Sequence, residues 1–161
     1  MRIWTLTLAL VVGAILVATA IATPSSGVVA ETSRGTLDER LNVNTRFDNG
    51  ARVKLQTKGP IELITQRIVA EPGATLGWHT HPGVNVNVVQ SGTLTLYHDK
   101  RCTTGMDYGP GTAFTTEGVH LARNESATET LIVYASYFAP KTTPALPVRV
   151  DQPSPGAGCP Q

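Results

Sequence analysis

Two histidines separated by a single residue, His79 and His81, are the clearest chemical feature of this 161-residue chain. In a β-strand, alternate side chains point to the same face, so both imidazoles are expected to reach one common point. Neutral imidazole binds Zn, Cu, Fe and Ni, with nitrogen–metal distances of about 2.0–2.1 Å. Because two ligands hold a metal weakly, the pair predicts a transition-metal site that takes further ligands from elsewhere.

The residues that follow this pair alternate in polarity. Asn85 and Asn87 have the parity of the histidines, whereas the intervening positions are valines. The strand is therefore expected to have one polar, imidazole-bearing face and one apolar face. The histidines and asparagines share a face only if no β-bulge at Pro82 and Gly83 shifts the alternation by one residue.

A third histidine, His120, follows a Glu117–Gly118 turn and begins another expected strand. Two stretches now resemble the two motifs of the cupin superfamily. The first motif, G(X)5HXH(X)3–4E(X)6G, is matched by Gly73, His79, His81, Asn85 and Gly92. The second, G(X)5PXG(X)2H(X)3N, is approached by Gly111, Gly118, His120 and Asn124. Thr116 stands where proline is usual, and the gap between Gly118 and His120 is one residue short.

This resemblance implies a small jelly-roll β-barrel in which His79, His81 and His120 bind a divalent transition metal. Asn85 stands where the family usually has a glutamate ligand, so it is implied to be a weak ligand or a hydrogen-bonding neighbour of the ligands. The lost carboxylate removes one negative charge from the site, which should weaken metal binding and leave the ion a stronger Lewis acid. The metal is left open among Zn, Fe, Mn, Ni and Cu, as is whether one binds at all.

The pattern of the whole chain predicts an all-β protein with a single domain. Short apolar segments separated by Gly, Pro and Asn recur about every ten residues, as in barrels and sandwiches. Strands are expected at residues 51–57, 61–70, 84–90, 93–98 and 130–138, with a hairpin that joins the third to the fourth. We assign 49–140 to the cupin-like jelly-roll barrel, 23–48 to a linker or N-terminal arm, and 141–161 to an extended, proline-rich tail.

Residues 1–22 are typical of a signal peptide, because an apolar run after one basic residue ends in small residues. The run is also long enough for an uncleaved membrane anchor. We therefore expect a secreted or extracytoplasmic protein, with membrane anchoring as the alternative. Cys102 and Cys159 are the only cysteines. In an exported protein they favour a disulfide that pins the tail to the loop between the two motifs, and two free thiols are the alternative.

Composition and motifs narrow the function. The net charge is +1 and no basic run occurs, so nucleic acid is not an expected partner. Nucleotide-binding, serine-hydrolase and CxxC motifs are absent from the sequence. Two functions stay open: a module that binds a metal and a small-molecule ligand in the barrel, or a metal-dependent enzyme. The enzyme would be an oxygenase, or less plausibly an isomerase or lyase, acting on a small organic substrate. The family resemblance also implies a homodimer.

One further motif has two interpretations. Asn124-Glu125-Ser126 fits the N-glycosylation sequon. The same asparagine occupies the last position of the second cupin motif, where a role in a turn is the simpler explanation.

Overall fold

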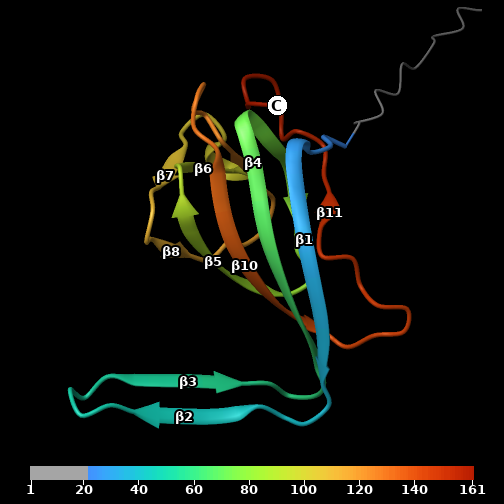
Figure 1. Ribbon diagram of the computed structural model, residues 1–161. Coiled ribbons are helices and arrows are strands. Elements are labelled where there is room, and N and C mark those ends of the chain that lie inside the picture. Colours follow the sequence, from blue (N-terminus) through green and yellow to red (C-terminus); the bar gives the residue numbers. More distant parts are fainter. Residues whose placement is uncertain (1–21) are drawn as a thin grey trace, which may run out of the picture.

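The computed structural model describes residues 22–161, in which the regular secondary structure is almost entirely β-strand (Figure 1). The strands are β1 (Ser26–Leu37), β2 (Asn42–Arg46), β3 (Arg52–Gln56), β4 (Ile61–Thr80), β5 (Val84–Ser91), β6 (Leu94–His98), β7 (Met106–Tyr108), β8 (Ala113–Phe114), β9 (His120–Arg123), β10 (Leu131–Pro140) and β11 (Val150–Asp151). A single 3-10 turn, η1 (Asp99–Arg101), follows β6. The all-β prediction is confirmed.

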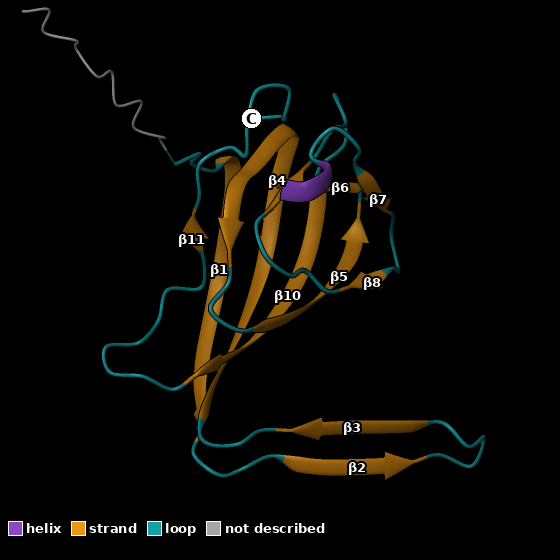
Figure 2. Ribbon diagram, turned by 180° about the vertical axis from the view of Figure 1, so that it is seen from behind, coloured by secondary structure: helices purple, strands orange, loops and turns teal. Residues whose placement is uncertain are grey.

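Nine strands form one sheet that curls into a nearly closed barrel of the jelly-roll type, with β4 as its central strand (Figure 2). The strand order is β7-β6-β9-β4-β10-β5-β8, and β1 and β11 also pair with β4. The first half of β4 pairs with β1 and β10, and its second half pairs with β9. Gly73 and Gly77 have φ angles of 74° and 68°, which residues with an L side chain rarely adopt. They allow β4 to bend from one wall of the barrel, where it pairs with β1 and β10, into the other wall, where it pairs with β9.

The turn at Gly92 does not form the predicted hairpin. β5 pairs with β10 and β8, whereas β6 pairs with β9 and β7. The chain therefore crosses from one wall of the barrel to the other at Gly92. A Cβ atom there would lie 2.8 Å from the carbonyl oxygen of Thr130, so the crossing requires glycine. Alternating polarity predicted where both strands lie in the sequence, but it does not determine which strands they pair with.

The polar face of β5 points into the barrel. Asn85 and Asn87 are buried, whereas Val84, Val86 and Val88 are on the outer surface. The hydrophobic core of the barrel includes the fully buried side chains of Ile64, Leu96, Leu131 and Val89. The two asparagines thus face the same interior as the histidines of β4.

The segment predicted as a linker, residues 23–48, differs from that expectation. β1 runs antiparallel to β4 from Val28, opposite Ala70, to Leu37, opposite Ile61. This segment was predicted as a linker or an N-terminal arm, but β1 lies at the edge of the barrel and is held there largely by backbone hydrogen bonds, so it needs little apolar burial. β2 and β3 pair only with each other and project from the barrel (Figures 1 and 2). The predicted strand at 51–57 is therefore not a barrel strand.

The signal-peptide or anchor prediction falls almost entirely on residues 1–21, which lie outside the described residues. Among residues 22–161, no helix has the length and apolar content needed to cross a membrane.

Cys102 and Cys159 form the predicted disulfide, with Cα atoms 5.0 Å apart. The bridge joins the segment that follows η1 to the end of the tail, 57 residues later in the sequence. In the chain-entropy model, closing a loop of this length stabilises the fold by about 4 kcal/mol. The tail itself has no helix and only the short strand β11.

The sequon asparagine Asn124 is fully buried, and its amide nitrogen lies 3.1, 3.0 and 2.7 Å from the carbonyl oxygens of Ala70, Glu71 and Glu129. This nitrogen is the atom that glycosylation would modify. Since it is committed to buried hydrogen bonds, the structure supports the role in a turn and not the sequon.

Candidate metal centre

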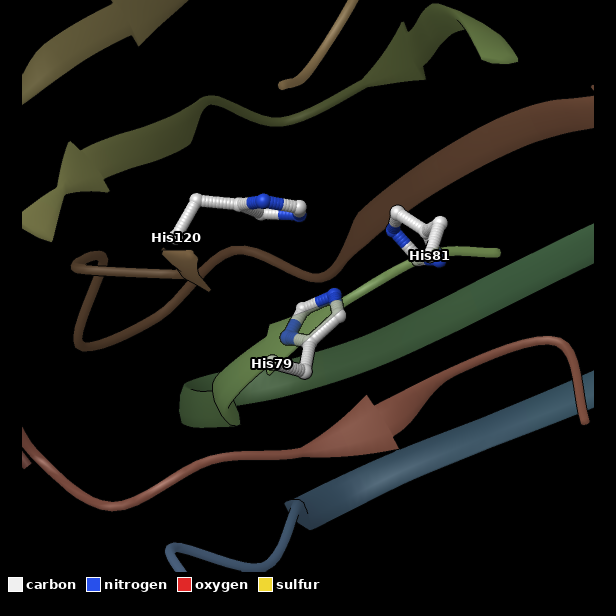
Figure 3. Close-up of side chains that lie close together, drawn as sticks. All are labelled: His79, His81 and His120. Carbon is white, nitrogen blue, oxygen red and sulfur yellow. The ribbon is translucent and has the colours of Figure 1, made fainter. Parts of the chain in front are cut away.

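The three predicted histidines converge at one end of the barrel (Figure 3). His79 lies in β4 opposite His120 at the start of β9, and His81 follows the end of β4. Their ring centroids are 4.4 to 5.1 Å apart, and one ligand nitrogen from each ring lies within 4.8 Å of the others. The fold therefore brings together the residues that the two motifs indicate.

Hydrogen bonds fix how each ring is turned. The Nδ1 atoms of His79, His120 and His81 lie 2.7, 3.0 and 2.8 Å from the carbonyl oxygens of Gly77, Gly118 and Val148. A carbonyl oxygen can only accept, so each Nδ1 carries the proton and donates. The lone pair of each ring is then on Nε2, which is free to bind a metal.

Gly77 and Gly118 have the same local function, which the sequence analysis missed. Each stands two residues before a histidine and has a positive φ, 68° and 65°. This turn directs the glycine carbonyl at the Nδ1 atom of the following histidine ring. The repeated Gly-x-His spacing was the available sequence signal, because glycine is the residue that adopts such φ angles without strain.

Burial keeps the three rings neutral. Desolvation and the neighbouring His120 lower the pKa of His79 from 6.5 to about 2. Desolvation is also the main cause that lowers the pKa of His120 to about 4, and it lowers the pKa of His81. Metals bind the neutral form of imidazole, so the cluster is ready to bind a cation at neutral pH.

The donor set fits a transition metal, although the rings are slightly too far apart. Ligand atoms at about 2.0–2.1 Å from one ion lie no more than about 4.2 Å from each other. With nitrogens up to 4.8 Å apart, the rings must move together by several tenths of an ångström on binding. Among the described residues, no carboxylate or thiolate joins this cluster, so the protein ligands would all be neutral.

Asn85 contacts Thr116 with both ends of its amide. Its Oδ1 accepts a hydrogen bond from the backbone N–H of Thr116 at 2.9 Å, and its Nδ2 donates to the Thr116 hydroxyl at 2.7 Å. Thr116 is the position where the second cupin motif usually has proline, which has no N–H to donate. Asn85 and Thr116, which both differ from the residues usual in the cupin motifs, therefore bind each other. Their hydrogen bonds connect β5 to the loop before His120.

The cavity beside the histidines is small. Inside the barrel it has a volume of about 30 Å³, close to the space of a single water molecule. A hollow of about 400 Å³ opens to solvent next to His81 and His120, between residues 82–84 and 115–118. A further cavity of about 130 Å³ also borders His79 and His81, and residues of β1, β4 and the tail line its walls. The hollow next to His81 and His120 gives a ligand an open approach to the site.

Acid should destabilise the metal-free protein. The unfolded chain binds protons at histidine near pH 6.5, whereas the native cluster does not, because its pKa values are lowered to about 4 for His120 and about 2 for His79. Their contribution to stability is complete above pH 6.5 and is lost as the pH falls towards 4. Urea unfolding of the metal-free protein at several pH values measures this. A free energy of unfolding that stays constant from pH 7 to pH 4 would contradict the neutral cluster.

Fold and site together define a cupin-like β-barrel with a three-histidine cluster. Strand order and the positions of the two motifs carry this assignment. No protein-family model matches the sequence, and no curated protein is significantly similar to it.

Several solved structures resemble the chain. One is the polyketide cyclase RemF from Streptomyces resistomycificus, with 15% identity and a TM-score of 0.42 over 47% of this chain and 54% of that one. A cupin-like protein from Thermotoga maritima has 18% identity and a TM-score of 0.46 over 59% and 68%. A cupin domain from Bordetella pertussis has 20% identity and a TM-score of 0.42 over 62% and 92%. The matched part of this chain spans only about half of the cyclase.

Proposed function

We propose that this protein is an exported cupin module that binds one divalent transition metal through Nε2 of His79, His81 and His120. One observation carries the proposal: each Nδ1 donates to a backbone carbonyl, which leaves Nε2 of each ring free, and the three rings form one cluster in which His79 and His120 are buried and His81 is half-buried. Zn, Fe, Ni and Cu all accept imidazole, and the donor set does not choose among them. Manganese prefers oxygen ligands, so this site suits it least.

Export is supported by two independent features. The chain has a disulfide, Cys102–Cys159, and disulfides persist mainly in oxidising compartments outside the cytoplasm. The composition of residues 1–22 is that of a signal peptide or an anchor. We therefore place the barrel outside the cytoplasm, either secreted or held at a membrane by its N-terminal segment.

A small ligand would bind at the open side of the site. Three neutral histidines leave the full charge of a dication uncompensated, which favours an anionic ligand at the remaining coordination positions. The same open positions support the alternative of a metal-dependent enzyme, in which the metal would supply Lewis acidity. The inward-facing partners on β5 are neutral amides, so binding without turnover is the better supported function.

A second copy of the chain is the macromolecular partner that we propose. Its support is the β2–β3 hairpin, which pairs with no other strand of residues 22–161 and exposes Val43, Val53 and Leu55 on one face. Isolated two-stranded hairpins are marginally stable in water, so this face would gain from being covered.

The metal content of the exported protein tests the proposal directly. The chain should be purified without chelator and without an affinity tag, then analysed by inductively coupled plasma mass spectrometry. We expect one transition-metal ion per chain, and metal added after stripping should raise the melting temperature. A stripped protein that neither takes up any of the candidate metals nor gains stability from them would refute the proposed function.

A further inference from the structure

The C-terminal tail is in direct contact with two of the three histidines, His79 and His81. β11 pairs with the end of β4, with Val150 opposite Thr80 and Asp151 opposite His79. Just before β11, the Val148 carbonyl accepts the Nδ1 hydrogen bond of His81 at 2.8 Å. His79 and His120 use carbonyls two residues earlier in the chain, but His81 depends on a carbonyl 67 residues away.

The tail is held mainly by hydrogen bonds to the barrel. The Thr23 N–H donates to the carbonyl of Gln152 at 3.0 Å, and the Arg34 guanidinium donates to the carbonyl of Leu146 at 3.0 Å. The Gln152 N–H donates to the carbonyl of Trp78 at 2.8 Å, and the buried indole of Trp78 donates to the carbonyl of Pro160 at 2.8 Å. Arg149 adds a hydrogen bond to the carbonyl of Leu76. No side chain of residues 141–161 is fully buried, and Val148 is the apolar residue of the tail that packs against the core. The covalent attachment at Cys159 is the strongest constraint on the far end of the tail.

We infer that the tail is a removable part of the metal site and that the Cys102–Cys159 bridge controls it. With the bridge closed, the Val148 carbonyl keeps the Nδ1 proton on His81 and its Nε2 directed at the cluster. With the bridge open, the tail detaches, and His81 loses the group that fixes its tautomer and ring orientation. This inference rests on the proposed metal site and adds a redox control to it.

The chemistry of the switch needs a thiol reductant. A small dithiol, or two equivalents of a monothiol, attacks the bridge through a mixed disulfide. The reductant is oxidised to its own disulfide, and Cys102 and Cys159 each leave as a thiol. Groups that orient a metal-bound histidine typically change metal affinity by 10- to 100-fold. We expect a weakening of that size when the bridge opens.

The first experiment reads the ring of His81 without any metal. In the metal-free full chain, ¹⁵N chemical shifts of the histidine rings should show Nδ1 protonated in all three. After reduction with a phosphine and removal of the reductant, His81 should become a mixture of the two tautomers, while His79 and His120 keep Nδ1 protonated. His120 is the internal control, because neither its carbonyl partner Gly118 nor its strand partners lie in the tail. His79 keeps its carbonyl partner Gly77, although its strand partner Asp151 lies in the tail. An unchanged His81 ring would overturn the inference even if the protein binds metal.

The second experiment measures metal affinity by competition with a chelator. The oxidised chain is compared with a variant that carries Cys102→Ser and Cys159→Ser, which cannot close the bridge and offers no thiol to the metal. A 10- to 100-fold weaker affinity is expected for the variant. Equal affinities would overturn the inference but leave the proposed function intact, whereas no binding by the oxidised chain would refute the proposed function itself.

Near-UV circular dichroism separates a local effect from unfolding. The barrel of the reduced chain should keep its aromatic signal, with a change confined to the environment of Trp78. If the signal is lost altogether, the bridge is needed for the barrel and not for the orientation of His81, and the inference is wrong. A chain that ends at Gln152 then serves as a second check, because it keeps Val148 and β11 but lacks Cys159. It should resemble the reduced chain.

Discussion

His120→Ala should reduce the affinity for a divalent transition metal by more than about a hundredfold, since even groups that merely orient a metal ligand contribute 10- to 100-fold. His120 is the ligand that comes from the second motif, and it is buried opposite His79. Without it, two imidazoles remain, and no described carboxylate is close enough to replace it. Isothermal titration of the metal-stripped protein with zinc measures the loss.

His98→Ala is the matched control for this substitution. His98 is the cross-strand partner of His120 in β6, but it is not part of the metal-ligand cluster. The same change of residue type one strand away should leave zinc affinity within about twofold, as expected for a residue that neither binds nor orients the metal. If both variants lose zinc equally, the loss reflects damage to the β6–β9 ladder, and His120 is not a ligand.

Asn85→Glu should tighten metal binding and destabilise the metal-free protein. The carboxylate would supply the anionic oxygen that the neutral cluster lacks, and an anionic ligand stabilises a bound dication. Without a metal, the same charge would be buried where Asn85 is now 1% exposed, with only the N–H and hydroxyl of Thr116 to stabilise it. Chelator competition and urea unfolding measure the two effects, which should have opposite signs.

Asn87→Glu distinguishes a new ligand from a general effect of charge. Asn87 lies on the same inward face of β5 and is also buried, but its amide points to the carbonyl of Phe114 instead of Thr116. This variant should lose stability without gaining metal affinity. An equal gain in both variants would mean that any negative charge in the barrel attracts the ion, and an unchanged affinity in Asn85→Glu would place that side chain outside the coordination shell.

The contact between Asn85 and Thr116 explains why this site can depart from the family pattern at two positions together. A glutamate at position 85 and a proline at position 116 would remove the amide donor and the backbone N–H that the pair now uses. The asparagine therefore has a structural role whether or not its oxygen ever reaches a metal. It holds the loop that leads to His120 against the wall of the barrel.

Local sequence was sufficient for the parts of the molecule that depend on side-chain spacing. The alternation in His79-Thr80-His81 places both imidazoles on one face of β4 because successive strand residues point to opposite sides. The motif spacing identified His120, and the regular turn residues predicted an all-β fold. The even number of cysteines, together with the signal-peptide-like composition of residues 1–22, predicted the disulfide.

Only the tertiary structure decided what depends on neighbours in space. The edge strand β1 forms because β4 offers it a row of backbone partners, which the polar composition of residues 23–36 does not reveal. β5 and β6 lie in different walls although a tight turn joins them, and β5 buries its asparagines instead of its valines. The orientation of His81 depends on a carbonyl of the tail. Residue spacing specifies the face of the strand on which a side chain lies. Strand pairing and the packing of distant segments determine which residues that side chain contacts.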